Sequence, residues 1–304
     1  MNRGKTVRRL AVAACVGLFL VQLMGATVTQ TESGRGCGDD WPLCNGKFVP
    51  DYTITSVIEY SHRAVSGVAG LLVLAATIAV FRSVDRREPR LFAAGSLFFT
   101  VVQAWLGAAQ VLNPQSDEIL ALHFGISLLA FACSLLTATS VRGDYRSSRY
   151  APNWRKVSPG YRWFVWLTAL YSYIVIYTGA YTSHTDSGGG CAGFPLCNGQ
   201  VIPAELEGAT AIAFMHRMAA YLLFVVILVL AIHTWRKYGN IARFAGAAAW
   251  ALALVVLQVA SGALMMALAG TGSYVIGTLL HTLIITVLFA VLAYMSVAVR
   301  KAGR

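Results

Sequence analysis

The sequence predicts an all-α integral membrane protein with eight transmembrane helices, arranged as two tandem four-helix bundles related by a pseudo-twofold repeat. Three observations support this class. Of the 304 residues, 57% are hydrophobic and 12% are charged, and the charged share is about half that of a soluble domain. Eight apolar runs are long enough to cross a bilayer. The second half of the chain repeats the motifs of the first. The composition excludes a soluble globular enzyme, a disordered chain and a small disulfide scaffold.

A helix crosses the bilayer core with about 20 apolar residues. Eight runs reach this length: 10–28, 57–81, 91–112, 119–141, 163–182, 209–232, 244–269 and 274–299. The first follows a basic segment, as in a signal peptide, but it is longer than a signal core and no small-residue cleavage site follows it. We therefore expect it to be a retained helix. With no Arg/Ser-rich transit peptide, the sequence favours a prokaryotic cell membrane over an organelle.

The basic residues indicate the topology. The net charge of +11 comes from 24 Lys and Arg against 13 Asp and Glu. Most of the basic residues lie at the two termini and in the connections 82–90, 142–162 and 236–243. The positive-inside rule therefore places both termini in the cytoplasm and the long loops 28–56 and 183–208 outside. Because membrane topology explains the charge, we expect no nucleic-acid partner.

The repeat pairs motifs in order along the two halves. The first half reads G25-A-T-V-T-Q-T-E-S-G-R-G-C37 and W41-P-L-C-N-G46, and the second reads G179-A-Y-T-S-H-T-D-S-G-G-G-C191 and F194-P-L-C-N-G199. S61-H-R63 then matches M215-H-R217, Gln103 with Gly107 matches Gln258 with Gly262, and His123 matches His281. We divide the chain into an amino-terminal four-helix half (1–141), a cytoplasmic linker (142–162) and a carboxy-terminal four-helix half (163–304).

Four histidines fall near the outer ends of the even-numbered spans: His62, His123, His216 and His281. Ionisable residues at this depth are rare and usually functional. Any one of them could be satisfied by a neighbouring helix, but four in matched pairs favour metal ligation. Two imidazoles on facing helices suit the two axial positions of a haem, whereas zinc needs three or four ligands in one place. His184 and His233 have no matching histidine and are expected not to ligate.

Arg63 and Arg217 each follow one of these histidines directly. A guanidinium suits a carboxylate, so both are possible partners of haem propionates. They could equally extend to the outer membrane interface.

Two cysteine pairs lie in the outer loops, Cys37 with Cys44 and Cys191 with Cys197. The outside of a cell is oxidising, so each pair is expected to form a local disulfide. A structural role is favoured for the second pair, and a redox or catalytic role stays open for the first. Cys15 and Cys133 are single thiols within spans and are interpreted as small buried hydrophobes.

Glu59 is the main difference between the halves. It lies three residues before His62, on the same helix face, and its counterpart is Ala213. A carboxylate at this depth is costly without a purpose. Solvation at the interface or a salt bridge with Arg63 would be the non-catalytic explanations. We favour a catalytic Glu59, so that its half performs chemistry and the other half binds a prosthetic haem.

The segments G-C-G-D-D-W-P-L-C-N-G, E59-Y-S-H-R63 and A-L-H123-F-G, in this order within eight spans, resemble those of the haem A synthase family. The resemblance implies a membrane oxidoreductase that converts haem O to haem A by oxidising the C8 methyl group to a formyl group. It implies that His62 and His123 hold the substrate haem and that His216 and His281 hold haem b. It also implies haem O synthase as the supplier, cytochrome oxidase assembly as the destination, and an electron donor or acceptor in the membrane.

Two other functions remain open from the sequence. A bis-histidine cytochrome b that only transfers electrons could use the same four histidines, although two equal relay sites would not need a single carboxylate at Glu59. A haem carrier or disulfide-exchange protein could use the outer cysteine pairs, but a thiol exchanger would not need four intramembrane histidines.

Overall fold

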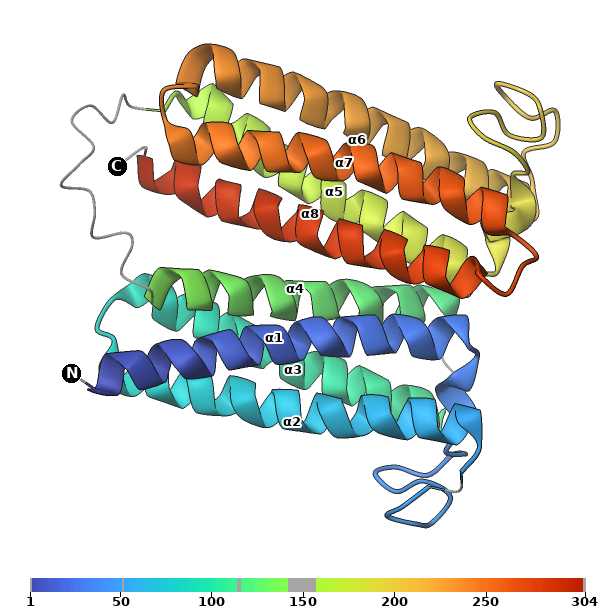
Figure 1. Cartoon of the computed structure of the whole chain (residues 1–304), viewed down its shortest axis with the longest axis horizontal. Helices are drawn as coiled ribbons and strands as arrows, with labels where there is room; N and C mark the ends of the chain where they lie inside the picture. Colours follow the sequence, from blue (N-terminus) through green and yellow to red (C-terminus); the bar gives the residue numbers. More distant parts are fainter. Residues whose placement is uncertain (1, 51, 114–115, 142–156, 303–304) are drawn as a thin grey trace. The chain divides into compact units, whose positions relative to one another are not determined.

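Figure 1 shows the computed structural model of the chain, which describes every residue except 1, 51, 114–115, 142–156 and 303–304. Ten helices form in this described part: α1 (Asn2–Gln30), η1 (Ser33–Arg35), α2 (Ile54–Ser83), α3 (Arg87–Leu112), α4 (Asp117–Val141), α5 (Pro159–His184), η3 (Ser187–Gly190), α6 (Gly208–Tyr238), α7 (Ala242–Leu268) and α8 (Tyr274–Ala302). Among the described residues, eight helices are long and apolar enough to cross a membrane. The predicted all-α, eight-span membrane fold is confirmed.

Most helices extend beyond the apolar runs that predict them. The first run is 10–28, but α1 begins at Asn2 and includes Lys5, Arg8 and Arg9. The apolar run reports the thickness of the hydrocarbon core, whereas the backbone hydrogen bonds of a helix continue into the interface. Side-chain caps mark the first turns of α2 and α5. Thr53 Oγ1 accepts the Ser56 N–H at 3.2 Å, and Ser158 caps α5 with Pro159 in its first turn.

The chain divides into two compact units, Met1–Pro152 and Asn153–Arg304. The boundary falls inside the predicted linker 142–162, of which residues 142–156 lie outside the described residues. In the first unit, α1 and α3 each pack against both α2 and α4. The helices α2 and α4 are therefore diagonal to each other across the bundle. Polar contacts add to the apolar packing, as where Ser96 Oγ donates to the Ala130 carbonyl at 3.1 Å.

The second unit has the same internal order. The helices α5 and α7 each pack against both α6 and α8, so α6 and α8 are diagonal. Large side chains such as Ile227, Phe244 and Leu288 are fully buried in this unit. Tyr161 and Thr234 join α5 to α6 through a hydrogen bond of 2.7 Å. The matched order of packing agrees with a repeat, and the pseudo-twofold relation between the units stays a prediction.

Candidate functional site

The four predicted ligand histidines lie on the diagonal helices of the two units. His62 and His123 lie on α2 and α4, and His216 and His281 lie on α6 and α8. Each is half-buried and lies six to eight residues after the first residue of its helix, which is about 9–12 Å along the axis. A haem held by the two histidines of one unit would therefore lie inside that bundle, towards the end that carries the disulfide loop.

Each of these histidine rings packs against a glycine of the preceding helix. The nearest ring atom to an added Cβ at Gly25, Gly107, Gly179 and Gly262 is the Cε1 of His62, His123, His216 and His281, at 3.3, 3.4, 2.8 and 3.5 Å. A larger residue would push the imidazole away from its helix neighbour. The repeated glycines therefore provide the space that each imidazole needs, and a pair of histidines in each bundle is a residue set that fits a haem.

The glycine contacts lead to a prediction. In Gly179→Ala the new Cβ would lie 2.8 Å from His216 Cε1, so the ring must move, and we expect about 10-fold weaker haem binding in the second unit. Gly262→Ala is the matched control, because its Cβ would lie at an ordinary 3.5 Å from His281. Haem content after purification is the measurement. Equal haem loss in the two variants would contradict this account.

The two histidines of the second unit have polar partners at their ring nitrogens. His216 Nδ1 lies 3.0 Å from Thr178 Oγ1. His281 Nδ1 lies 2.8 Å from Ser261 Oγ, and its Nε2 lies 2.7 Å from the Gln258 amide nitrogen. In the first unit, His62 Nδ1 is buried and has no hydrogen-bond partner among the described residues. The hydrogen bonds at Nδ1 of His62 and of His216 therefore differ, although the helices of the two units pack in the same order.

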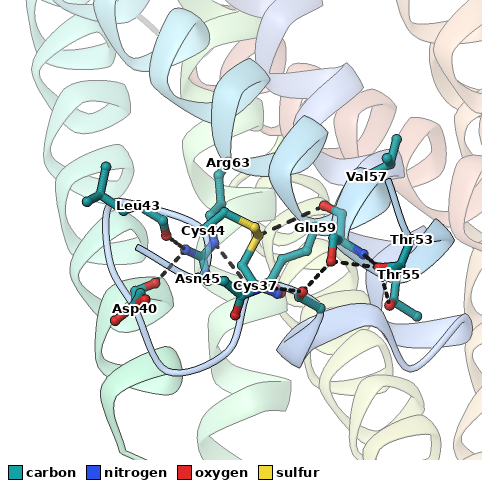
Figure 2. The surroundings of a disulfide bond; sticks show 12 residues. Cys37, Asp40, Leu43, Cys44, Asn45, Thr53, Thr55, Val57, Glu59 and Arg63 are labelled. Atoms are coloured by element: carbon teal, nitrogen blue, oxygen red, sulfur yellow. Dashed lines mark hydrogen bonds and ion pairs between the residues drawn. A yellow bond between two sulfur atoms is a disulfide. The ribbon is translucent and has the colours of Figure 1, made fainter. Parts of the chain in front are cut away.

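Glu59 is tied to the first disulfide loop. Figure 2 shows its side chain on α2 facing the Cys37–Cys44 disulfide. Glu59 is 4% exposed, and its Oε2 accepts the backbone N–H of Cys37 at 2.8 Å. Its Oε1 accepts from Arg63 Nε at 3.1 Å and also pairs with Arg63 Nη2. The salt bridge is therefore present, and it holds the carboxylate at the loop rather than in bulk solvent.

Arg63 also binds the loop itself. Its Nη1 donates to the carbonyl oxygens of Asp40 at 2.7 Å and Leu43 at 2.8 Å, as Figure 2 shows. Gly36 allows the loop to approach α2, because a Cβ there would overlap the backbone of Thr55. The carboxylate, the guanidinium and the disulfide loop thus form one connected group, defined here as the Glu59 network: Cys37, Asp40, Leu43, Cys44, Glu59 and Arg63.

The second unit keeps this loop but lacks the carboxylate. Arg217 Nη1 donates to the carbonyls of Gly193 at 2.8 Å and Leu196 at 2.9 Å, and its Nη2 donates to the Cys191 carbonyl. Ala213 packs with Cys191 and Cys197 in a small buried cluster. A methyl group therefore suffices to support the loop, so the loop fold does not by itself require Glu59.

These contacts limit the number of hydrogen bonds that Arg63 and Arg217 can offer to haem propionates. A guanidinium has five N–H donors. The hydrogen bonds described here use four of them on Arg63 and three on Arg217. Arg217 thus keeps two donors for a carboxylate and Arg63 keeps one.

Both predicted disulfides form in the structure. Cys37 pairs with Cys44 and Cys191 with Cys197, with Cα–Cα distances of 4.3 and 4.7 Å. All four cysteines are buried. Cys15 and Cys133 are free thiols and half-buried.

Removing the first disulfide should loosen its loop without unfolding the spans. Closure of so short a loop contributes about 2–3 kcal/mol in the chain-entropy model. We expect Cys37→Ser with Cys44→Ser to raise hydrogen exchange at the loop amides and leave the helices protected. The pair Cys191→Ser with Cys197→Ser is the control. Free thiols at these positions in protein purified without reductant would contradict the pairing, and loss of turnover with haem still bound would require a chemical role for the first pair.

The remaining histidines lie away from this arrangement. The His233 ring stacks on Tyr161 with centroids 5.6 Å apart and an interplanar angle of 15°. His184 is the last residue of α5, whereas the apolar pattern places it at the start of an outer loop. Neither contacts a repeated glycine as the four other histidines do.

Sequence reasoning missed Thr178 and Ser261. Each directly precedes a repeated glycine, and the matching residues in the first half are Met24 and Leu106. A comparison of the two halves could have found them, because each is a polar residue whose counterpart in the first half is apolar, next to a glycine that both halves share.

Comparison with known proteins decides the family. Residues 51–293 match the model of the cytochrome oxidase assembly protein family. The chain belongs to this family. It is 42% identical to the haem A synthase of Symbiobacterium thermophilum over 99% of this chain and 97% of that protein. It is 41% identical to the haem A synthase of Shouchella clausii over 98% of both chains, and 38% identical to that of Halalkalibacterium halodurans over 95% and 96%.

Membership of the cytochrome oxidase assembly family confirms the resemblance found from the motifs. The matched region includes all four bundle histidines, Glu59 and the second disulfide loop. The first pair, Cys37 and Cys44, lies before residue 51 but within the nearly full-length match to the relatives.

Proposed function

We propose that this chain is a haem A synthase, a membrane oxidoreductase that converts haem O to haem A by oxidising the C8 methyl group to a formyl group. The observation that carries the proposal is the buried Glu59 beside His62, in a unit whose counterpart has Ala213 at the same place. The relatives named haem A synthases support it, because they match almost the whole chain.

The two units would divide the work. His62 and His123 would hold the substrate haem O in the first unit, and His216 and His281 would hold haem b in the second. The glycine contacts at all four rings support a haem in each unit, and Glu59, which only the first unit has, supports placing the substrate there. When bound, haem supplies the redox chemistry that protein side chains cannot perform. The oxidation of a methyl to a formyl group takes one oxygen atom from water or dioxygen and releases protons and electrons, so it also needs an electron partner, which we place in the membrane.

Glu59 would serve the substrate unit as a proton acceptor or as a fixed negative charge beside the oxidised carbon. Arg63 and the Cys37 N–H hold its carboxylate oxygens. These contacts pre-position the group, so that little reorganisation is needed when charge develops. The disulfide keeps the loop that supplies Cys37 closed over α2.

The position in the membrane follows from the charges. Both termini would face the cytoplasm, and the disulfide loops and histidines would lie towards the outer face, in a prokaryotic cell membrane. Arg217, with two remaining donors, would be the stronger propionate partner, and Arg63 the weaker one. Haem O synthase would supply the substrate, and cytochrome oxidase assembly would use the product.

Conversion of haem O tests this proposal. The chain is expressed with a haem O synthase in cells that lack a haem A synthase, and the extracted haems are identified by mass. We expect haem A to appear only when both proteins are present. Haem O left unconverted, with haem b alone in the purified protein, would favour the electron-transferring cytochrome b.

A further inference from the structure

The hydroxyl groups of Thr178 and Ser261 each contact the Nδ1 of a histidine in the second unit, at 3.0 Å for His216 and 2.8 Å for His281. Thr178 Oγ1 donates its hydrogen to the Val175 carbonyl at 2.8 Å. Ser261 Oγ donates its hydrogen to the Gln258 carbonyl at 2.9 Å. A hydroxyl that donates to its carbonyl turns its lone pairs to the histidine nitrogen beside it, where it can accept a hydrogen bond from an Nδ1–H group. The two contacts therefore suit the tautomer of His216 and of His281 that carries its proton on Nδ1.

The opposite ring nitrogen is then a lone-pair acceptor. At His281 this agrees with a second contact, because the Gln258 amide nitrogen lies 2.7 Å from Nε2 and an amide N–H can only donate. A neutral imidazole with its proton on Nδ1 can ligate iron through Nε2, and at His281 the Gln258 amide that contacts this nitrogen would have to move aside. The hydroxyls also orient the rings, as outer hydrogen-bond partners of metal ligands do.

The first unit lacks both hydroxyls. Met24 precedes Gly25 where Thr178 precedes Gly179, and Leu106 precedes Gly107 where Ser261 precedes Gly262. The leucine side chain cannot accept a hydrogen bond, and a methionine sulfur is a weak acceptor. His62 Nδ1 is accordingly buried with no partner in the part of the chain that the structure describes. The glycine contacts are repeated in both units, but the hydroxyls are not.

We propose that Thr178 and Ser261 are positioning residues that make the haem of the second unit a resident group, and that Met24, which offers His62 no such hydroxyl, lets a haem enter and leave the first unit. The inference rests on the proposed function, since it assumes a haem in each unit. It extends that function, because a haem A synthase that also holds haem b must release its product and retain the haem b. Outer partners of this kind change metal affinity by about 10- to 100-fold.

Haem release from the purified holoprotein tests the proposal. Excess apomyoglobin captures the haem b that leaves, and the reduction potential of the remaining haem b is measured in the same preparation. We expect Thr178→Val and Ser261→Ala each to speed release by about 10-fold or more. The potential should rise, because a histidine without its hydrogen-bond acceptor donates less electron density to the iron. Thr178→Ser keeps the hydroxyl group, so its haem release rate and reduction potential should equal those of the wild type.

Thr168→Val is the matched control. Thr168 is buried on the same helix, and its hydroxyl bonds the carbonyl of Phe164 within that helix. It should change neither release nor potential. In the opposite direction, Met24→Thr with Leu106→Ser should slow the release of haem from the first unit.

Two results would overturn the inference while leaving the proposed function in place. One is a normal release rate and potential in Thr178→Val and Ser261→Ala. The other is an equal change in Thr168→Val, which would show a general effect of packing. A wild-type protein that holds no haem b would overturn the inference and the assignment of the second unit together.

Discussion

Glu59→Gln is expected to lower the rate of haem A formation by about 10²-fold or more, while the haem content barely changes. Glutamine keeps the volume of the side chain and an oxygen that can accept the Cys37 N–H, but it removes the charge and the proton-accepting carboxylate. Ala213 occupies the matching position in the second unit, so the bundle does not need a carboxylate there to fold. The ratio of haem A to haem O in membranes with a haem O synthase measures the effect.

Glu207→Gln is the control for this experiment. Glu207 is an exposed carboxylate that precedes α6, so its substitution should leave the ratio unchanged. Near-normal haem A production by Glu59→Gln would refute a catalytic role. Loss of haem from the first unit would instead make Glu59 a structural partner of Arg63, to which it is already joined.

His216→Ala is expected to lose most of the haem b of the purified protein. Its removal takes away one predicted haem ligand and the ring nitrogen that contacts Thr178 Oγ1, so the visible spectrum of a two-histidine haem should disappear. His233→Ala is the control, because His233 lies on the same helix but stacks on Tyr161. Its haem b content should remain normal. An unchanged spectrum in His216→Ala would exclude His216 as a ligand.

The eight spans could be predicted from the sequence because the bilayer leaves few choices. A segment such as 57–81 must satisfy its backbone groups internally, so an apolar run of this length must be helical. The helix ends could not be predicted as well. α2 begins at Ile54, after Thr53, because the cap and the interface, rather than hydropathy, determine where a helix begins.

The Glu59 network contains a contact that the sequence alone could not predict. The repeat identified Glu59 and its counterpart Ala213, and helical spacing placed Glu59 near His62. Neither could show that a loop amide, that of Cys37, binds the carboxylate. That contact depends on the path of the loop back to α2, which is set by a disulfide and a close approach at Gly36. Sequence spacing does not give the path of the loop, so it could not decide between a salt bridge and a catalytic role for Glu59.

The division of labour between the units is tested most directly by the haems that remain bound to His62→Ala. Wild-type protein and this variant are purified from cells that also make haem O, and the released haems are identified and counted by mass. Wild type is predicted to release haem b together with haem O or haem A. His62→Ala is predicted to release haem b alone. A His62→Ala protein that keeps haem O or haem A but has lost haem b would contradict the assignment of substrate to the first unit.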